Sequence, residues 1–154
     1  MEDNFSITNK TKKRMPVLPF LAIKNDILGK RYSLSLAFID KKTSRKINKT
    51  YRNKDKATNV LSFEISKKSG EIVMCPELIQ AESKNPEKNF NKNYREFLGF
   101  LVIHGMLHLK GMQHSSIMNI AEEKYDKKYF YRDRHRILYD QGHSRGVLKR
   151  RKKS

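Results

Sequence analysis

Three histidines of the chain, at positions 104, 108 and 114, lie inside its most apolar segment, residues 100–114. On an α-helix of 3.6 residues per turn, His104 and His108 lie one above the other on the same face. Gly111 follows where such a helix would end, and glycine readily adopts the left-handed conformation that turns the chain back. His114 can then return toward the first two rings. The spacing predicts that His104, His108 and His114 bind one metal ion.

The pattern of these residues, H-G-x-x-H-x-x-G-x-x-H, matches the zinc-binding pattern H-E-x-x-H-x-x-G-x-x-H of metzincin peptidases at every position but one. In those peptidases the glutamate takes a proton from the attacking water, whereas this chain has Gly105 at that position. The pattern therefore indicates a metal site that lacks the peptidase base. Three histidines suit one zinc ion, and also nickel or copper.

A closed structural zinc site has four protein ligands and is usually rich in cysteine. Cys75 is the only cysteine of the chain, and its apolar surroundings favour a small buried side chain. The triad is therefore expected to keep a coordination position open for chemistry. The alternative is that the three histidines are core residues satisfied by hydrogen bonds. His135 and His143 stand among charged residues and are expected to be solvated.

The charge of the chain points to a polyanionic partner. Thirty-four Lys and Arg against sixteen Asp and Glu give a net charge of +18, which favours nucleic acid, although many soluble proteins are basic without binding it. Residues 144–154 include five successive cations, and we expect them to form a flexible tail in which Lys149, Arg150 and Arg151 bind nucleic acid.

No apolar run reaches the ~18 residues that cross a bilayer, and the first residues lack the apolar core of a signal peptide. These features, with the single cysteine, predict a cytoplasmic protein that does not bind membranes.

The remaining patterns predict an α/β (α+β) fold: a small mixed sheet packed against helices, with a central buried helix that binds the metal. Strands are expected at FSITNK, YSLSLAFID, NVLSFEI and EIVMC, the last two joined by the loop SKKSG. Helices are expected at MPVLPFLAIKNDILGK, at SRKINKTYR opened by Ser44, at REFLGFLVIHGMLHLK, and from about Ser115 to Tyr139. A polar linker, ESKNPEKNFNKN, precedes the central helix. We expect one metal-hydrolase-like domain over residues 1–143, followed by the tail.

Two separate motifs, HGMLHLKGMQH and YRNKDKATNVLSFEI, together with GEIVMCPE, resemble the YbeY family of bacterial metal-dependent endoribonucleases. The resemblance runs from about Ser33 to Tyr139. It implies a single α/β domain, one zinc ion on the three histidines, a functional arginine at Arg52, and a role in maturing ribosomal RNA, at the 3′ end of 16S ribosomal RNA, and in quality control of ribosomes.

The chain departs from the family pattern before the third histidine, where Met112 and Gln113 replace tyrosine and aspartate. A role of that carboxylate around the metal would then be lost or rest with the amide of Gln113. Glu71 likewise stands where the family more often has aspartate.

Arg52 carries a planar, permanently charged guanidinium group, which can bind two oxygens of a phosphate group at once. Without the resemblance, Arg52 could be one more solvated cation. Lys54 and Lys56 either bind the RNA backbone or shape the turn before the next strand. The sequence thus predicts hydrolysis of RNA phosphodiester bonds, in which the proton acceptor stays open between hydroxide at the metal, Glu71 and the 2′-hydroxyl of the RNA. The alternative is an RNA-binding factor of ribosome assembly whose metal is mainly structural. A peptidase is the weakest reading, because the glutamate is missing.

Overall fold

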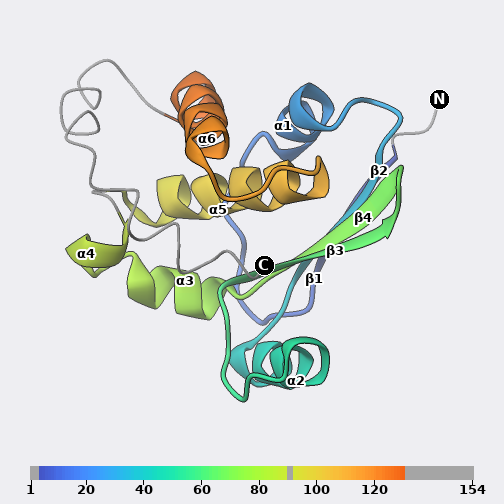
Figure 1. Ribbon diagram of the computed structural model, residues 1–154. Coiled ribbons are helices and arrows are strands. Elements are labelled where there is room, and N and C mark those ends of the chain that lie inside the picture. The colour runs from blue at the N-terminus through green and yellow to red at the C-terminus, as the bar shows by residue number, and fades with distance from the viewer. Residues whose placement is uncertain (1–3, 90–91, 131–154) are drawn as a thin grey trace.

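The computed structural model describes residues 4–89 and 92–130. In chain order the elements are β1 (Phe5–Asn9), α1 (Phe20–Ile27), β2 (Ser33–Phe38), α2 (Lys41–Arg52), β3 (Val60–Ser66), β4 (Ser69–Met74), α3 (Pro76–Glu82), α4 (Pro86–Asn89), α5 (Tyr94–Leu109) and α6 (Ser116–Tyr129). The mixed α+β architecture predicted from the sequence is confirmed (Figure 1).

The four strands form one sheet in the order β1-β2-β4-β3. β1, β2 and β4 run parallel, while β3 and β4 form an antiparallel hairpin at one edge. Leu36 at the centre of β2 lies between Ile7 of β1 and Ile72 of β4. The alternation in β2 has the predicted sense, because Leu34 and Leu36 are fully buried whereas Ser33 is exposed. The predicted strands and the hairpin loop are therefore confirmed.

Helix α5 runs between the sheet on one side and helices α1 and α6 on the other (Figure 1). Every residue from 97 to 107 is buried, as the absence of a polar face in its sequence requires. Its start is fixed by a capping box in which the Asn93 side chain accepts a hydrogen bond from the Glu96 backbone N–H and the Glu96 carboxylate accepts one from the Asn93 N–H. The predicted central helix is confirmed.

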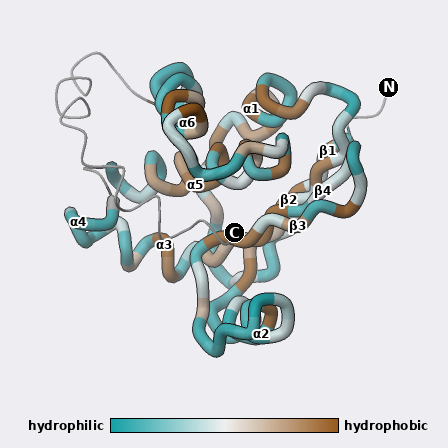
Figure 2. The backbone as a smooth tube through the Cα atoms, viewed as in Figure 1, coloured by the Kyte–Doolittle hydropathy of each residue, from teal (hydrophilic) through white to brown (hydrophobic). Residues whose placement is uncertain are grey.

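Helix α2 lies at the end of the sheet where β2 ends and β3 begins, and the strands separate it from α5 and α6 (Figure 1). Most of α2 has the colour of hydrophilic residues (Figure 2). The prediction that Ser44 opens this helix was wrong. Asp40 is the cap, because its carboxylate accepts a hydrogen bond from the Thr43 backbone N–H. Ser44 is buried one turn later and exchanges two hydrogen bonds with the backbone of Thr58.

The segment predicted as a polar linker contains the end of α3 and the short helix α4. The tail, His135, His143 and the predicted boundary at residue 143 lie outside the described residues, as does the predicted part of the last helix beyond residue 130. Within the described residues, none of the helices combines the length and apolar character needed to cross a membrane.

Candidate metal centre

The three histidines of the motif meet at one point, as predicted. His104 and His108 lie on α5, and the chain then turns at Gly111, whose φ of 105° is in the left-handed region. His114 follows in this turn, directly before Ser115 caps α6. One potential ligand atom from each ring lies within 4.8 Å of the others. One helix and the glycine turn that follows it therefore create a group that the helix alone could not supply.

The hydrogen bonds of two rings show which nitrogens face the centre. The Nδ1 atom of His104 bonds to the carboxylate of Glu122, and the Nδ1 atom of His108 bonds to the carbonyl oxygen of Met112. Both partners are acceptors, so in the neutral rings each Nδ1 carries the proton. The two Nε2 atoms are then lone-pair donors, and they face each other at 3.2 Å.

This spacing fits a shared cation. Two nitrogens bound to one tetrahedral zinc ion at about 2.0–2.1 Å from the metal lie about 3.3 Å apart. The group of potential ligands contains only the three histidines among the described residues, so at least one position of a tetrahedral ion would stay open to other molecules. The donor set therefore fits an open, catalytic type of zinc site better than a closed structural one.

His108 is held in the form that can bind a metal. Burial lowers its pKa to about 4, with further lowering from His104 and His114, against a smaller opposite effect of the Met112 carbonyl. The ring is therefore neutral at pH 7, and its Nε2 lone pair needs no deprotonation before it can coordinate.

The carboxylate that orients the site was not predicted from the sequence. Glu122 on α6 is fully buried, and its Oε2 atom lies 2.5 Å from Nδ1 of His104. Such a carboxylate fixes the tautomer and the orientation of a metal-binding histidine. Gln113, the residue considered for this role, is exposed. A signal was present in the sequence, because Met118, Glu122 and Asp126 recur every four residues and together form a buried stripe on α6.

We expect Glu122→Gln to weaken zinc binding by about 10- to 100-fold, because the amide cannot accept the Nδ1–H bond with the strength of a carboxylate. Competition with a chromogenic chelator measures the affinity. Glu123→Gln is the matched control, since Glu123 is the next residue and pairs with Lys127 at 3.4 Å instead of with a histidine. Equal zinc affinity in the Glu122→Gln variant and the unaltered protein would remove Glu122 from the site.

Gly105 marks the closest approach of α5 to the sheet. A Cβ atom at this position would lie 3.0 Å from the Ser62 hydroxyl and 3.1 Å from Cδ1 of Ile72. The Ser62 hydroxyl also donates a hydrogen bond to the Gly105 carbonyl. The space in which a peptidase would carry its glutamate is thus filled by β3 and β4. A larger side chain at position 105 would therefore require Ser62 or Ile72 to move aside.

Arg52, the predicted functional arginine, is the last residue of α2 and is half-buried. Burial lowers its pKa. Within the described part of the chain it makes no ion pair and no side-chain hydrogen bond, whereas Arg45 on the same helix is bound by both oxygens of Asp55. Lys54 and Lys56 lie in the turn that follows, where the backbone N–H of Lys56 bonds to the Lys54 carbonyl.

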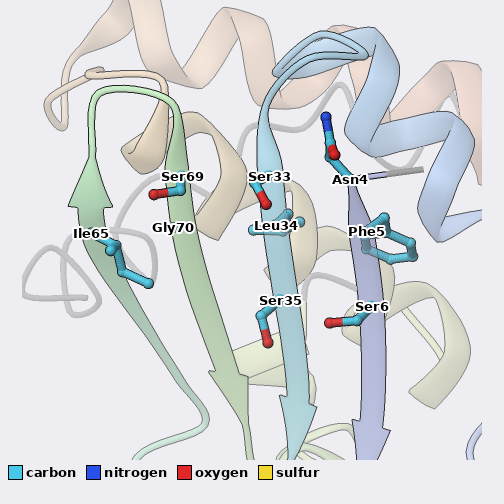
Figure 3. A pocket seen from close by; sticks show the side chains of 9 residues that line it. All are labelled: Asn4, Phe5, Ser6, Ser33, Leu34, Ser35, Ile65, Ser69 and Gly70. Carbon is cyan, nitrogen blue, oxygen red and sulfur yellow. The ribbon is translucent and has the colours of Figure 1, made fainter. Parts of the chain in front are cut away.

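Two hollows of the described chain lie apart from the histidines. One, of about 330 Å³, crosses the strands, and Figure 3 shows the hydroxyl groups of Ser6, Ser33, Ser35 and Ser69 around it. The other, of about 310 Å³, lies between the segment after β1, the residues directly before α2 and the first residues of α3. No histidine lines either hollow, so neither is part of the candidate metal centre.

Comparison with known proteins agrees with the resemblance. A family model described as Endoribonuclease YbeY matches residues 3–129. A protein of Bdellovibrio bacteriovorus named Endoribonuclease YbeY is 41% identical over 88 residues, which are 56% of this chain and 56% of that protein, little more than half its length. Another of that name, from Staphylococcus aureus strain Newman, is 34% identical over 126 residues, which are 73% of this chain and 77% of the relative.

The fold also has a solved counterpart. The solution structure of TM1509 from Thermotoga maritima is similar to this structure with a TM-score of 0.57 and 23% sequence identity, and the match covers 80% of this chain and 87% of that one. At this identity the likeness supports the fold alone. The family model, in contrast, spans the strands, the three histidines and α6. The chain therefore belongs to the YbeY endoribonuclease family.

Proposed function

We propose that the chain is a zinc-dependent endoribonuclease that hydrolyses phosphodiester bonds in RNA, with one zinc ion held by His104, His108 and His114. The observation that carries this proposal is the 3.2 Å approach of two Nε2 lone pairs whose opposite ring nitrogens are both bound to acceptors. Two such lone pairs repel each other unless a cation lies between them. Membership in an endoribonuclease family supports RNA as the substrate.

The side chains around the histidines prepare the site before RNA binds. Glu122 and the Met112 carbonyl hold two rings in one tautomer, and the low pKa of His108 keeps its Nε2 available. A zinc ion bound there would supply Lewis-acid chemistry, which polarises a phosphoryl oxygen and acidifies a water molecule. The protein contributes the orientation of the three rings and the buried surroundings in which charge is stabilised more strongly than in water.

Arg52 binds the scissile phosphate in this proposal. Its guanidinium has no carboxylate partner among the described residues, so its charge is available to an anion. The end of α2 is fixed to the sheet by an edge contact between the Tyr51 and Phe63 rings, whose centroids lie 5.3 Å apart. Phe63 belongs to β3, the edge strand whose neighbouring residue Ser62 bonds to Gly105 beside His104. Phe63 is paired with Glu71 and points away from α5, so a phosphate bound by Arg52 would reach the histidines across the edge of the sheet at β3.

The proton acceptor is better sought in the RNA or in solvent than in Glu71. Ile72 packs toward Gly105 on α5, and successive side chains of a strand point to opposite faces. Glu71 therefore points to the other face of the sheet from α5 and the histidines. Of the three alternatives, hydroxide at the metal and the 2′-hydroxyl of the RNA therefore remain.

For the natural substrate we propose ribosomal RNA, including the 3′ end of 16S ribosomal RNA, and for the location the cytoplasm. The family supports the substrate, and the net charge of +18 supports a large polyanion such as the ribosomal subunit. We further propose one domain over residues 1–143 and a tail over residues 144–154 in which Lys149, Arg150 and Arg151 bind RNA without sequence preference, as Lys54 and Lys56 do beside α2.

Removal of the metal tests the proposed function. Dialysis of the full chain against a strong chelator should abolish cleavage of ribosomal RNA, and one equivalent of zinc should restore it. Circular dichroism and RNA binding are measured on the same samples. Cleavage that persists without metal would contradict the proposal. If no metal-loaded sample cleaved RNA and removal of the metal unfolded the chain, the result would instead favour an RNA-binding assembly factor with a structural metal.

Replacement of Arg52 should reduce the cleavage rate at saturating RNA by about 10²- to 10³-fold in Arg52→Gln, the size found when one preorganised donor to developing charge is lost. Arg52→Lys should recover only part of this, because an ammonium group cannot bind two phosphate oxygens in a planar fork. The exposed Arg31 supplies the control variant Arg31→Gln. A rate equal to that of the unaltered protein in Arg52→Gln would exclude the assigned role.

A further inference from the structure

The charged side chains of helix α2 are all cations. With 100° between successive residues, five of them fall on one arc of about 140°. We call them the cationic face of α2: Lys41, Lys42, Arg45, Lys46 and Lys49, all exposed. The buried side of the helix is formed by Ser44 and Asn48, which bond to the backbone of the segment before β3. Arg52 lies on the same arc as the cationic face, at its end.

This arrangement is unfavourable for an isolated helix. Lys41 and Arg45, Lys42 and Lys46, and Arg45 and Lys49 are like charges four residues apart, which repel each other on a helix surface. The first turn contains two lysines and no acidic residue, so the helix dipole opposes them as well. Asp40 at the cap and Asp55 beside Arg45 are the carboxylates that bond to α2 residues within the described chain.

Two lysines on α6 are arranged differently. On α6, Lys127 pairs with Glu123 at 3.4 Å, and Lys128 pairs with Asp26 at 2.6 Å. Surface helices commonly alternate the signs of their charges in this way. On the cationic face of α2, in contrast, Arg45 is the one residue with an ion pair among the described residues, so four neighbouring cations of this face are left without a carboxylate.

The positive area continues beyond the helix. The segment after β1 contributes Lys10, Lys12 and Lys13 to the hollow of about 310 Å³ that Asp40, the cap of α2, also lines, with Glu77 as a second acidic residue. This segment is ordered by the Asn9 side chain, which accepts hydrogen bonds from Thr11 and donates one to the Lys13 carbonyl. In Figure 1 it lies at the end of the sheet that α2 occupies.

We infer that the cationic face of α2 binds the sugar-phosphate backbone of RNA beyond the scissile bond, on the opposite side of the sheet from the metal centre. Lysines on an open helix face bind phosphates as point charges and read no bases. The face leads to Arg52, so RNA bound along it would be directed to the edge strand β3. This inference rests on the proposed function for its substrate, but it assigns a binding surface that the metal chemistry does not require.

The salt dependence of binding tests the inference. The probe is a short oligothymidylate, which shares the phosphate backbone of RNA and lacks the 2′-hydroxyl group, with the metal-loaded full chain throughout. Lys42→Gln/Lys46→Gln should bind more weakly at low salt, and its plot of log affinity against log salt should be less steep by about 1.4, since each single-strand phosphate contact contributes about 0.7. Glutamine is a good helix former, so circular dichroism should be unchanged.

The charge-matched control is Lys30→Gln/Lys84→Gln, which removes two exposed lysines outside α2 and should keep the slope of the unaltered protein. Equal slopes for the two double variants would overturn the inference. An unchanged slope in the α2 variant together with lost binding to an acidic protein would overturn it in favour of a protein partner. Failure of the chain to cleave RNA would refute the proposed activity separately, because the slope is measured on a probe that is not cleaved.

Discussion

Replacing His104 and His108 together with alanine should remove the bound metal and lower the rate of RNA cleavage by at least about a thousandfold, equivalent to ~4 kcal/mol of transition-state stabilisation. The two Nε2 atoms that face each other at 3.2 Å would both be lost. His114 alone, in the turn after α5, cannot hold a zinc ion at the affinity of a three-histidine site. Metal analysis of the purified protein and a cleavage assay measure the two effects.

The double variant must be compared with a protein that has lost histidines elsewhere. His135→Ala/His143→Ala removes the two histidines of the chain that lie outside the motif, and it should keep both metal and activity. Because His104 is buried against Glu122, the folding of the His104→Ala/His108→Ala variant is checked by circular dichroism. A folded double variant that still cleaves RNA at the original rate would show that the histidines do not form the catalytic centre.

The triad could be predicted from the sequence because its geometry is local. The spacing of four residues places His104 and His108 on one helix face whatever surrounds the helix, and Gly111 permits the turn that returns His114. All three positions lie within eleven residues of the chain, from 104 to 114. A site built from one helix and its following turn needs little knowledge of the rest of the fold.

Glu122 could not be placed in the same way, because its contact with His104 depends on how α6 packs against α5. Glu122 and Glu123 are neighbouring carboxylates of one predicted helix, and the sequence does not tell which of them packs against α5. The structure separates the two neighbours: Glu122 faces the histidine and Glu123 faces Lys127. Similarly, Ser44 and Asp40 are both good caps, and only the contact of Ser44 with Thr58 excludes it.

The burial of Lys92 is a second feature that the sequence patterns did not predict. It stands in a segment read as a polar linker, yet its side chain is fully buried, with Nζ 3.3 Å from Oδ2 of Asp126 on α6 and 5.0 Å from the centre of the Phe100 ring. Burial lowers the pKa of Lys92, while Asp126, Glu96 and Glu122 oppose that shift. Asp126 thus lies on the same buried stripe of α6 as Glu122, the carboxylate that orients His104.

Asp126→Asn should lower the free energy of unfolding by about 3–5 kcal/mol, because it leaves the buried ammonium of Lys92 without the carboxylate that faces it. Lys92→Met should be comparably destabilising, since a buried carboxylate would then lose its cation. The double variant Lys92→Met/Asp126→Leu should regain most of the loss, because apolar side chains of similar size replace a charged pair that is costly to desolvate. Urea unfolding at one fixed zinc concentration measures all three.

The exposed pair Arg45–Asp55 is the matched control, because its N–O distance of 2.7 Å is shorter than that of Lys92–Asp126 while its side chains are 60% and 52% exposed. Solvent screens such a pair, so Asp55→Asn should change the urea midpoint far less than Asp126→Asn. If the two substitutions had equal effects, burial would not be what makes Lys92–Asp126 important. If the double variant were as unstable as the single variants, the stability of the fold would depend on the charges of Lys92 and Asp126 themselves. These charges would then also help to hold Glu122 in its position behind the metal centre.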